Sequence, residues 1–365
     1  MLYNVRAVRI LRSVSEVTMT AKKRSLIIVL IMCLLCMVFF CACSIGDKKT
    51  PLKVIIIPKL EVNEITGDFP GEAQLFYENY CADCEEAEIP HMPSTARFFV
   101  NEENGVGILL TGSGKAAAGL SLTALLSSEL YDYSDAYIVS VGCAGGNMSH
   151  CTLGDVILVT TACDYDLGHH VDAHEKEKSN SRIMWFADDA YSDYEFKSFD
   201  TDLCDKVYGM IKDVPLKTTK AAKEMLKDNY PSLDESDLTP SVKKGTSLTG
   251  DNYWKGLYSH DTANYIAEYY GCPEPYTVTE MEEIAIANTA ECYGLLDRVI
   301  SMRVIVNTDL FMEGETPEET WGEYKSFNEK VETENNETLD IFEPAMHNLY
   351  DTASKVIDAI LEGKM

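Results

Sequence analysis

The chain has 365 residues, of which 46% are hydrophobic and 25% charged, proportions typical of a globular protein rather than a disordered one. Its formal net charge is −28; residues 1–42 hold six Lys or Arg and one acid, a contribution of +5, which leaves the remainder near −33. Such an acidic body repels nucleic acid and anionic membrane surfaces, so a polynucleotide partner is excluded, whereas a neutral small molecule meets no electrostatic barrier.

The N-terminal segment is predicted to direct the chain out of the cytoplasm. An apolar run over 26–42 follows Lys22-Lys23-Arg24, as in a secretory signal. The run ends in F-C-A-C-S, which resembles a bacterial lipoprotein processing site with Cys43 as the lipidated residue, although Phe replaces the usual Leu. An uncleaved membrane segment is the alternative. We therefore expect three parts, anchored outside the cytoplasm on the bacterial cell membrane: a signal peptide or membrane segment at 1–42, a tether at 43–51 and a folded domain at 52–365.

Apolar runs alternate with helical patterns along this domain. In chain order they predict a strand at 53–57, a helix at 71–80, a strand at 106–111, a helix at 116–130, and strands at 137–141 and 155–160. Residues 161–200 are polar and aromatic without periodicity, and irregular segments of that length are commonly functional. Further elements are expected as helices at 201–212, 219–228, 258–270, 282–294 and 343–361, and strands at 246–249, 276–279 and 299–306. The alternation predicts an α/β fold with a mostly parallel mixed central sheet flanked by helices on both faces, and a ligand at the carboxyl ends of the strands.

Two glycine-rich motifs follow predicted strands. T-G-S-G-K at 111–115 opens an alanine-rich helix, so its glycines permit a tight turn beside the helix N-terminus. Its spacing does not fit a Walker A loop, and a plain turn explains it equally well. V-G-C-A-G-G at 141–146 exposes bare backbone suited to a flat heterocycle, with close packing of two elements as the alternative.

Three polar motifs end other strands. T-E-M-E-E at 279–283 supplies more acids than helix capping needs, and a carboxylate there can accept hydrogen bonds from two neighbouring hydroxyls, as on a ribose. R-V-I-V-N-T-D at 303–309 ends in an amide and an acid that can both donate to a ring nitrogen, the acid once protonated. T-G-D-N-Y-W at 249–254 places two aromatics where they could stack on a base, although core aromatics are commoner.

Metal binding and disulfides have weaker signals. His170, Asp172 and His174 alternate in the irregular segment and could bind zinc, but no further ligand completes a set, so we expect no metal. Cys81 and Cys84 form a C-x-x-C pair that fits a local disulfide or free thiols better than a redox or zinc site.

Six motifs, taken in chain order, resemble the nucleoside phosphorylase and nucleosidase superfamily. They are T-G-S-G-K-A-A-A-G, V-G-C-A-G-G, L-G-D-V-I-L-V, T-G-D-N-Y-W, E-M-E-E-I-A-I-A and R-V-I-V-N-T-D. Two further motifs resemble, more narrowly, the purine nucleoside permease family: E-I-T-G-D-F-P-G-E-A-Q at 64–74 and Y-D-L-G-H-H at 165–170. The resemblance covers about 52–361. It implies a nucleoside phosphorylase-like fold, purine nucleosides as ligands, no cofactor and a homo-oligomer.

The resemblance also implies roles for particular residues. Met281 and Glu282 would hold the ribose, and the base would lie among Cys143, Ala144, Gly145, Tyr253, Trp254 and Asn307. Glu282, Asn307 and Asp309 would be catalytic: Asn307 takes the position that addresses purine N7, where adenine-directed nucleosidases usually carry Asp and enzymes preferring 6-oxopurines carry Asn. Hydrogen bonds from Glu282 would strengthen as the ribosyl group becomes oxocarbenium-like.

The attacking group is left open. Phosphorylases of this fold usually place an Arg just before the second glycine motif, but residues 138–141 read I-V-S-V. Nucleosidases activate water with a Glu after the first strand, for which Glu61, Glu64 and Glu72 are candidates. Gly112, Gly114 and Lys115, or Arg97, could still hold phosphate as a co-substrate.

Three functions are therefore weighed. The first is N-glycosidic cleavage of purine nucleosides by hydrolysis or phosphorolysis, of which hydrolysis fits the sequence better. The second is a non-catalytic nucleoside-binding lipoprotein that contributes to uptake, which would need a membrane partner because a single anchor forms no pore. A metal-dependent hydrolase centred on the histidine segment ranks last.

Overall fold

The computed structural model describes residues 49–61, 65–67, 70–167, 194–229, 234, 236–311 and 339–365. Residues 50–365 form one compact unit. Several predicted features lie outside the described residues. They are the signal segment, most of the tether with Cys43, the candidate Glu64, and the histidine segment with His170, Asp172 and His174. None of the described helices is long and apolar enough to cross a membrane.

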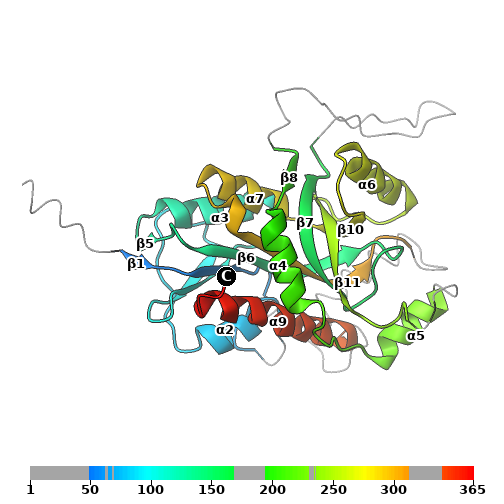
Figure 1. The fold of residues 1–365 in the computed structure, drawn as a ribbon, viewed down its shortest axis with the longest axis horizontal. Helices are drawn as coiled ribbons and strands as arrows, with labels where there is room; N and C mark the ends of the chain where they lie inside the picture. The colour runs from blue at the N-terminus through cyan, green and yellow to red at the C-terminus, as the bar shows by residue number, and fades with distance from the viewer. Residues whose placement is uncertain are drawn as a thin grey trace, which may run out of the picture. The chain divides into compact units, whose positions relative to one another are not determined.

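The described strands form a mixed sheet in the order β10-β9-β7-β11-β6-β2-β4-β3, with β8 paired to β7 (Figure 1). Their bounds are β2 (Val54–Ile57), β3 (Arg97–Asn101), β4 (Val106–Leu110), β6 (Tyr137–Gly146), β7 (Val156–Asp164), β8 (Phe196–Ser198), β9 (Val242–Thr249), β10 (Tyr276–Glu280) and β11 (Val299–Thr308). The short strands β1 (Thr50–Pro51) and β5 (Tyr131–Asp132) pair separately. The central strands are parallel, and β7 runs antiparallel to β11.

Helices cover both faces of this sheet. They are α2 (Gln74–Tyr80), α3 (Lys115–Ser127), α4 (Thr201–Ile211), α5 (Lys220–Asn229), α6 (Leu257–Tyr269), α7 (Glu283–Cys292) and α9 (Leu339–Leu361), with a 3-10 turn η1 (Leu296–Arg298). Figure 1 shows α3 and α7 on one side of β2 and β6, and α2 and α9 on the other. The predicted α/β class, with a mixed sheet between two helical layers, is confirmed.

Local sequence explains these elements. The four residues of β2 are fully buried β-branched side chains, as a strand covered on both faces requires. Helix α4 begins after Asp200, whose carboxylate accepts a 2.7 Å hydrogen bond from the N–H of Leu203. It buries Cys204, Val207 and Ile211, which recur on one helical face.

The sheet curls so that its edge strand β10 also pairs antiparallel with β6. Gly145 lies opposite Thr279 in this pairing, and a Cβ on Gly145 would stand 2.8 Å from Cγ2 of Thr279. The absence of a side chain therefore lets β10 approach β6 and closes β10, β9, β7, β11 and β6 into a ring.

Two predictions of local structure are wrong. The V-G-C-A-G-G motif is not a turn after a strand ending at 141, because β6 continues to Gly146 and pairs along both edges there. The segment 161–200 is not irregular at its ends, since β7 runs to Asp164 and β8 begins at Phe196. Strand β3 and the small β1–β5 sheet were not predicted at all.

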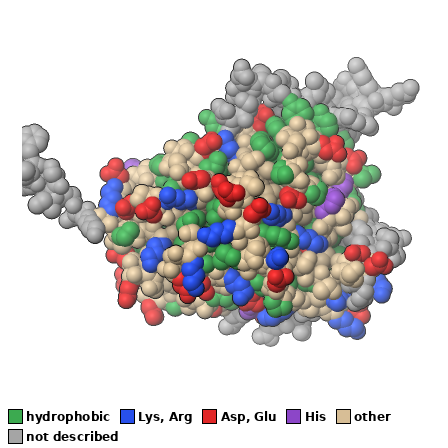
Figure 2. Space-filling model, viewed as in Figure 1, with side chains coloured by type: hydrophobic (Ala, Val, Ile, Leu, Met, Phe, Trp, Pro, Cys, Tyr) green, Lys and Arg blue, Asp and Glu red, His purple; other side chains and the backbone are tan. Residues whose placement is uncertain are grey.

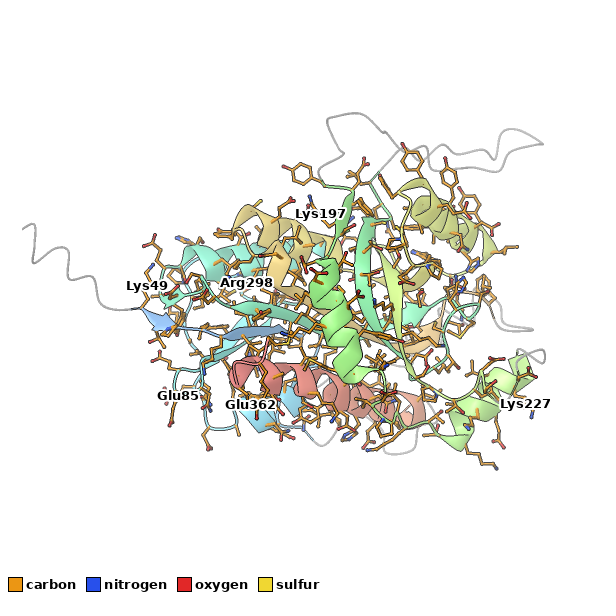
Figure 3. All side chains as sticks on the ribbon, in the orientation of Figure 1. Lys49, Glu85, Lys197, Lys227, Arg298 and Glu362 are labelled. Carbon is orange, nitrogen blue, oxygen red and sulfur yellow. The ribbon has the colours of Figure 1, made fainter. Side chains whose placement is uncertain are left out.

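Acidic and basic side chains are interspersed over the face shown in Figure 2. The charged side chains of Glu85, Lys227 and Glu362 are exposed at the periphery (Figure 3).

Candidate active site

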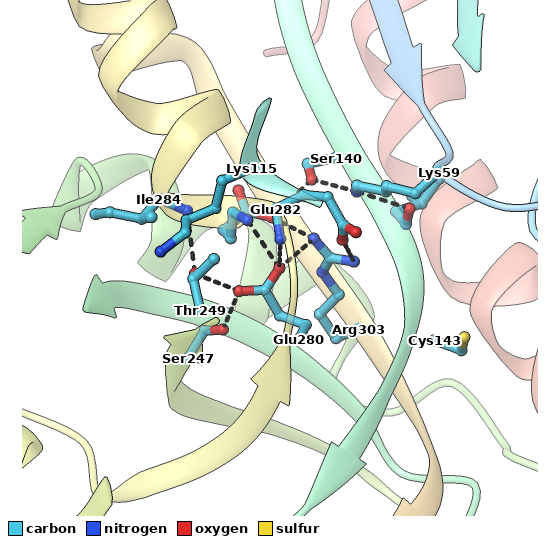
Figure 4. Close-up of polar contacts among 12 residues, drawn as sticks. Lys59, Lys115, Ser140, Cys143, Ser247, Thr249, Glu280, Glu282, Ile284 and Arg303 are labelled. Atoms are coloured by element: carbon cyan, nitrogen blue, oxygen red, sulfur yellow. Dashed lines mark hydrogen bonds and ion pairs between the residues drawn. The ribbon is translucent and has the colours of Figure 1, made fainter. Parts of the chain in front are cut away.

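A buried group of charged side chains lies where β2, β6, β10 and β11 meet (Figure 4). It contains two cations and four acids, all buried: Lys59, Arg303, Glu72, Glu280, Glu282 and Glu283. We call these six residues the buried charge cluster. Because burying one charge is costly unless it is paired and hydrogen-bonded, the contacts within the cluster decide what it can do.

Arg303, in the middle of β11, is the central cation of the cluster. Its Nη2 donates to Oε2 of Glu280 and to Oε2 of Glu283, both at 3.0 Å, and Nη1 lies 3.6 Å from Oε2 of Glu282. Burial opposes the charge, but the surrounding carboxylates outweigh it and raise the pKa of the guanidinium. The sequence motif contained Arg303, yet our sequence analysis gave it no role.

Glu280 organises the start of α7. Its Oε1 accepts hydrogen bonds from the hydroxyls of Ser247, at 2.9 Å, and Thr249. Its Oε2 accepts the backbone N–H groups of Glu282 at 2.7 Å and Glu283 at 2.8 Å. Glu280 thus acts as a cap that sets the direction in which the next two acids point.

Glu282 joins the acidic motif to the first glycine motif. Its Oε1 accepts a 2.8 Å hydrogen bond from the N–H of Gly114, which has a φ of +97° that favours glycine. Burial, with Glu280 nearby, raises the pKa of Glu282 to about 7. This carboxylate therefore changes protonation near neutral pH, at the position where the resemblance implies ribose binding.

Glu72 and Lys59 form the other side of the cluster. Oε2 of Glu72 accepts the N–H groups of Lys59 at 2.8 Å and Leu60 at 3.1 Å, while Oε1 accepts the N–H of Cys143 at 2.7 Å. Each carboxylate oxygen can accept more than one hydrogen bond, so this fixed carboxylate can still orient a water molecule. Of the glutamates considered after the first strand, the structure brings Glu72 into the cluster.

The ammonium of Lys59 supplies a cation that sequence reasoning missed. Its Nζ donates to Oγ of Ser140 at 2.7 Å and to the carbonyl of Val141 at 2.9 Å, within the stretch 138–141 that itself carries no positive charge. Ser140 in turn donates to Oε2 of Glu283 at 2.7 Å. Burial, together with Arg303, lowers the pKa of Lys59 to about 8. A lysine two residues after the fully buried β2 was the available signal.

Gly142 shows where the two halves of the cluster face each other. A Cβ at this residue would stand 2.6 Å from Nη1 of Arg303 and 3.0 Å from Oε1 of Glu72. Glycine therefore allows a guanidinium and a carboxylate to approach the same point above the β6 backbone, which a methyl group would fill.

Other candidates for the attacking side have partners elsewhere. Glu61 caps α2, accepting the N–H groups of Gly71 at 2.8 Å and Gln74 at 3.0 Å. Arg97 lies on β3 and pairs with the exposed Glu86 at 2.9 Å.

Lys115 is held by acids from β7 and its following turn. Its Nζ lies 3.0 Å from both carboxylate oxygens of Asp164 and 3.2 Å from Oδ2 of Asp166. Although burial opposes it, these two carboxylates raise the pKa of Lys115. The lysine is therefore already paired with two acids beside Gly112 and Gly114, rather than presented to an anion.

Asn307 lies over the end of β6. The point where a Cβ on Gly145 would stand is 3.1 Å from Nδ2 of Asn307. Ala144 is buried beside it, whereas Cys143 and Met281 are half-buried. The structure thus brings Asn307 together with the predicted base-binding backbone.

The two predicted aromatics differ in their surroundings. The ring of Trp254 stacks on Tyr165, with centroids 4.9 Å apart, while Tyr253 is 54% exposed. Trp254 also lies 6.1 Å from the ring of Tyr276. Sequence reasoning missed Tyr165, which sits directly after β7.

Asp309 is buried just beyond β11, in a polar group of its own. Its Oδ2 accepts the hydroxyl of Tyr276 at 2.9 Å and lies 2.7 Å from Nδ1 of His260. Burial raises the pKa of this carboxyl, although His260 acts in the opposite direction.

Within the described ranges, no three His, Cys, Asp or Glu side chains are grouped so as to hold a metal ion. The eight described cysteines, including Cys81 and Cys84, are free thiols.

A model of the family described as Purine nucleoside permease (NUP) matches residues 51–364. The chain belongs to the purine nucleoside permease family. Within the family, a probable purine nucleoside permease of Schizosaccharomyces pombe is 25% identical over 222 residues, 56% of this chain and 63% of that protein. The purine nucleoside permease of Candida albicans is 26% identical over 214 residues, 54% of this chain and 52% of that protein. The matched stretch thus spans between half and two thirds of these permeases.

Solved structures share the fold. A 5′-methylthioadenosine/S-adenosylhomocysteine nucleosidase from Colwellia psychrerythraea, in complex with adenine, has 17% identity and a TM-score of 0.50, covering 86% of this chain and 96% of that one. Futalosine hydrolase of Helicobacter pylori has 13% identity and a TM-score of 0.50, covering 84% and 97%. The likeness confirms the nucleoside phosphorylase-like fold of this permease-family chain.

Proposed function

We propose that this protein binds purine nucleosides and cleaves their N-glycosidic bond by hydrolysis. The observation that carries the proposal is the buried charge cluster, in which four carboxylates surround two cations where β2, β6, β10 and β11 meet. Structures of the same fold named as a nucleosidase and a hydrolase support the cleavage, and the family name supports purine nucleosides as the ligands.

The balance of charge in the cluster favours a cationic transition state. With every group ionised, the carboxylates exceed the cations, and buried charges interact strongly because little water screens them. A ribosyl group that becomes oxocarbenium-like as the base departs would offset this excess, so the cluster would bind the transition state more tightly than the neutral nucleoside.

The same balance disfavours phosphate as the attacking group. A phosphate anion would add negative charge beside Glu72, Glu282 and Glu283, and both cluster cations already contact protein oxygens. Water suits the arrangement better, since Glu72 is fixed by three backbone N–H groups and faces Arg303 across Gly142. We assign Glu72 the role of orienting the water and accepting its proton.

Substrate contacts follow from the positions of the remaining residues. Glu282 and Met281 would take the ribose, because Glu282 is buried and ionises near neutral pH. Asn307, above Gly145, would hydrogen-bond the departing purine, and the Tyr165–Trp254 stack would limit the base pocket.

The direct test incubates the purified protein with inosine, guanosine and adenosine, with and without phosphate, and measures free base by chromatography. We expect base release that does not require phosphate and is lost in Glu72→Gln. Release only with phosphate would show phosphorolysis instead.

The second candidate is nucleoside capture without cleavage, which the permease name of the family favours. It predicts calorimetric binding of intact inosine with no base released, and a membrane partner for uptake.

We further propose an extracytoplasmic, lipid-anchored location, supported by the basic, apolar and F-C-A-C-S segments of the N-terminus. Incorporation of labelled palmitate in bacterial cells, lost in Cys43→Ser, would test it. An unmodified, unprocessed N-terminus would contradict it.

A further inference from the structure

Two cysteines far apart in sequence are in contact near the stacked rings of Tyr165 and Trp254. Cys163 is the penultimate residue of β7, and Cys272 follows α6 in the connection to β10. Their sulfur atoms lie 3.6 Å apart across a separation of 109 residues. A disulfide needs a sulfur–sulfur distance of about 2.05 Å, so closure requires an approach of roughly 1.5 Å.

Both backbones are held in place. Cys163 pairs in register with Leu248 of β9 and with Phe196 of β8. The N–H of Cys272 donates a 3.0 Å hydrogen bond to the carbonyl of Ala267, at the end of α6. The fold therefore holds the two sulfur atoms next to each other, and a disulfide can form by rotation of the two side chains.

The two thiols differ in character. Cys163 is fully buried, whereas Cys272 is partly exposed. The hydrogen bond from Cys163 lowers the pKa of Cys272 to about 7, and the hydroxyls of Thr161 and Thr246 act in the same direction. The same hydrogen bond, with burial, raises the pKa of Cys163. Cys272 is thus the accessible thiolate and Cys163 the buried thiol that it contacts.

We propose that Cys163 and Cys272 are an oxidative modification site, in which a small-molecule disulfide converts the pair into a protein disulfide. With glutathione disulfide as the oxidant, the Cys272 thiolate attacks one sulfur, the S–S bond breaks and one glutathione thiolate leaves. Cys163 then loses its proton to that thiolate and attacks the Cys272 sulfur, displacing the second glutathione. Two protein thiols are oxidised and glutathione disulfide is reduced to two thiols.

The disulfide would fasten a part of the molecule that holds the candidate site. Asp164, which binds Lys115, and Tyr165, which stacks on Trp254, directly follow Cys163 in the chain. Closure would therefore tie the end of β7 to the α6–β10 connection. This inference is independent of the proposed cleavage, and its test needs no nucleoside.

The test exposes the reduced protein to glutathione disulfide, blocks remaining thiols with N-ethylmaleimide and maps peptides without reduction by mass spectrometry. We expect a cross-linked peptide containing Cys163 and Cys272, and a melting temperature raised by about 5 °C that returns to its starting value with dithiothreitol. Cys163→Ser should instead leave one glutathione on Cys272, and Cys292→Ser, which removes an exposed thiol outside the pair, should leave the cross-link unchanged.

Three outcomes would overturn the inference. Both cysteines could remain fully alkylated while Cys81 and Cys84 become cross-linked. The wild-type protein could retain glutathione on Cys272 without resolution by Cys163. Finally, the rise in melting temperature caused by glutathione disulfide could persist in Cys272→Ser.

Discussion

The backbone N–H of Gly114 donates a 2.8 Å hydrogen bond to Oε1 of Glu282, across 168 residues of chain. This contact joins the loop before α3 to the residue before α7, and the other oxygen of Glu282 faces Arg303. Glu282 is therefore fixed at both oxygens by groups that favour its ionised form, while burial opposes ionisation and brings its pKa to about 7.

Nucleoside binding is expected to depend on pH through Glu282. An ionised carboxylate accepts hydrogen bonds from two ribose hydroxyls, so affinity should increase as the pH rises from 6 to 8 through the pKa of about 7. Glu282→Gln should weaken binding roughly 10- to 100-fold and flatten this pH profile. Calorimetry with inosine over this range measures both effects; an unchanged profile in the variant would place the ribose elsewhere.

The same group has an effect of opposite sign on stability. The native state keeps the proton of Glu282 up to about pH 7, whereas the unfolded chain loses it near pH 4.5. Between these values the native state binds more protons, so this group's contribution to the free energy of unfolding falls as the pH rises. Comparing urea unfolding of wild type and Glu282→Gln at pH 5 and pH 8 isolates the contribution.

Gly142→Ala should damage the site by steric overlap. The new Cβ would stand 2.6 Å from Nη1 of Arg303 and 3.0 Å from Oε1 of Glu72, so these groups must move apart. We expect base release to fall on the order of 100-fold and stability to fall by about 1–3 kcal/mol. Gly209→Ala is the matched control: a Cβ there meets nothing within 4 Å on α4, so activity should be unchanged and stability should rise by about 1 kcal/mol. Wild-type activity in Gly142→Ala would mean that Arg303 and Glu72 do not act together.

Lys59→Met should destabilise the fold. The substitution removes the cation that contacts Ser140 and the Val141 carbonyl, and it leaves the buried carboxylates with Arg303 as their remaining cluster cation. We expect a loss of about 3 kcal/mol in the free energy of unfolding, measured in urea. The control Lys217→Met removes an exposed ion pair and should change stability by less than about 1 kcal/mol. Equal losses in the two variants would contradict a special role for Lys59.

The wild-type protein should also show the titration of Lys59. Its pKa of about 8 lies below that of the unfolded chain, so between pH 8 and about 10.5 the native state binds fewer protons. Its contribution to stability therefore rises with pH over that interval, and Lys59→Met should lack this rise.

The fold was largely predictable because buried strands carry a strong local signal. Strands were predicted at 53–57 and 299–306 from their β-branched residues, and the structure has β2 at Val54–Ile57 and β11 at Val299–Thr308. The carboxyl end of β6 was not predictable in the same way, because consecutive glycines such as Gly145 and Gly146 are typical of turns. In the structure they belong to the strand because they pair with β10 and β11. That pairing depends on residues more than 100 positions away.

The candidate site was predictable only as a set of motifs. Glu282 and Asn307 stood at strand ends and could be singled out. Lys59 could not be linked to Ser140 from the sequence, because Lys59 follows β2 and Ser140 lies on β6, and the two meet through the parallel pairing of these strands. The choice of Glu72 over Glu61 likewise depended on which carboxylate caps α2 and which reaches Cys143.

Base preference should depend on Asn307. Its amide lies over Gly145, and an amide N–H can donate to the carbonyl oxygen of a 6-oxopurine, whereas a carboxylate would repel that oxygen and accept from the amino group of adenine. We therefore expect Asn307→Asp to shift the ratio of kcat/KM for adenosine over inosine by at least about tenfold, chiefly through kcat. Asn79→Asp adds the same charge on the exposed surface of α2 and should leave the ratio unchanged, which separates a local effect from that of net charge. If both variants kept the wild-type preference, Asn307 would not contact the base, and the specificity would have to arise from the group around Trp254 and Asp309.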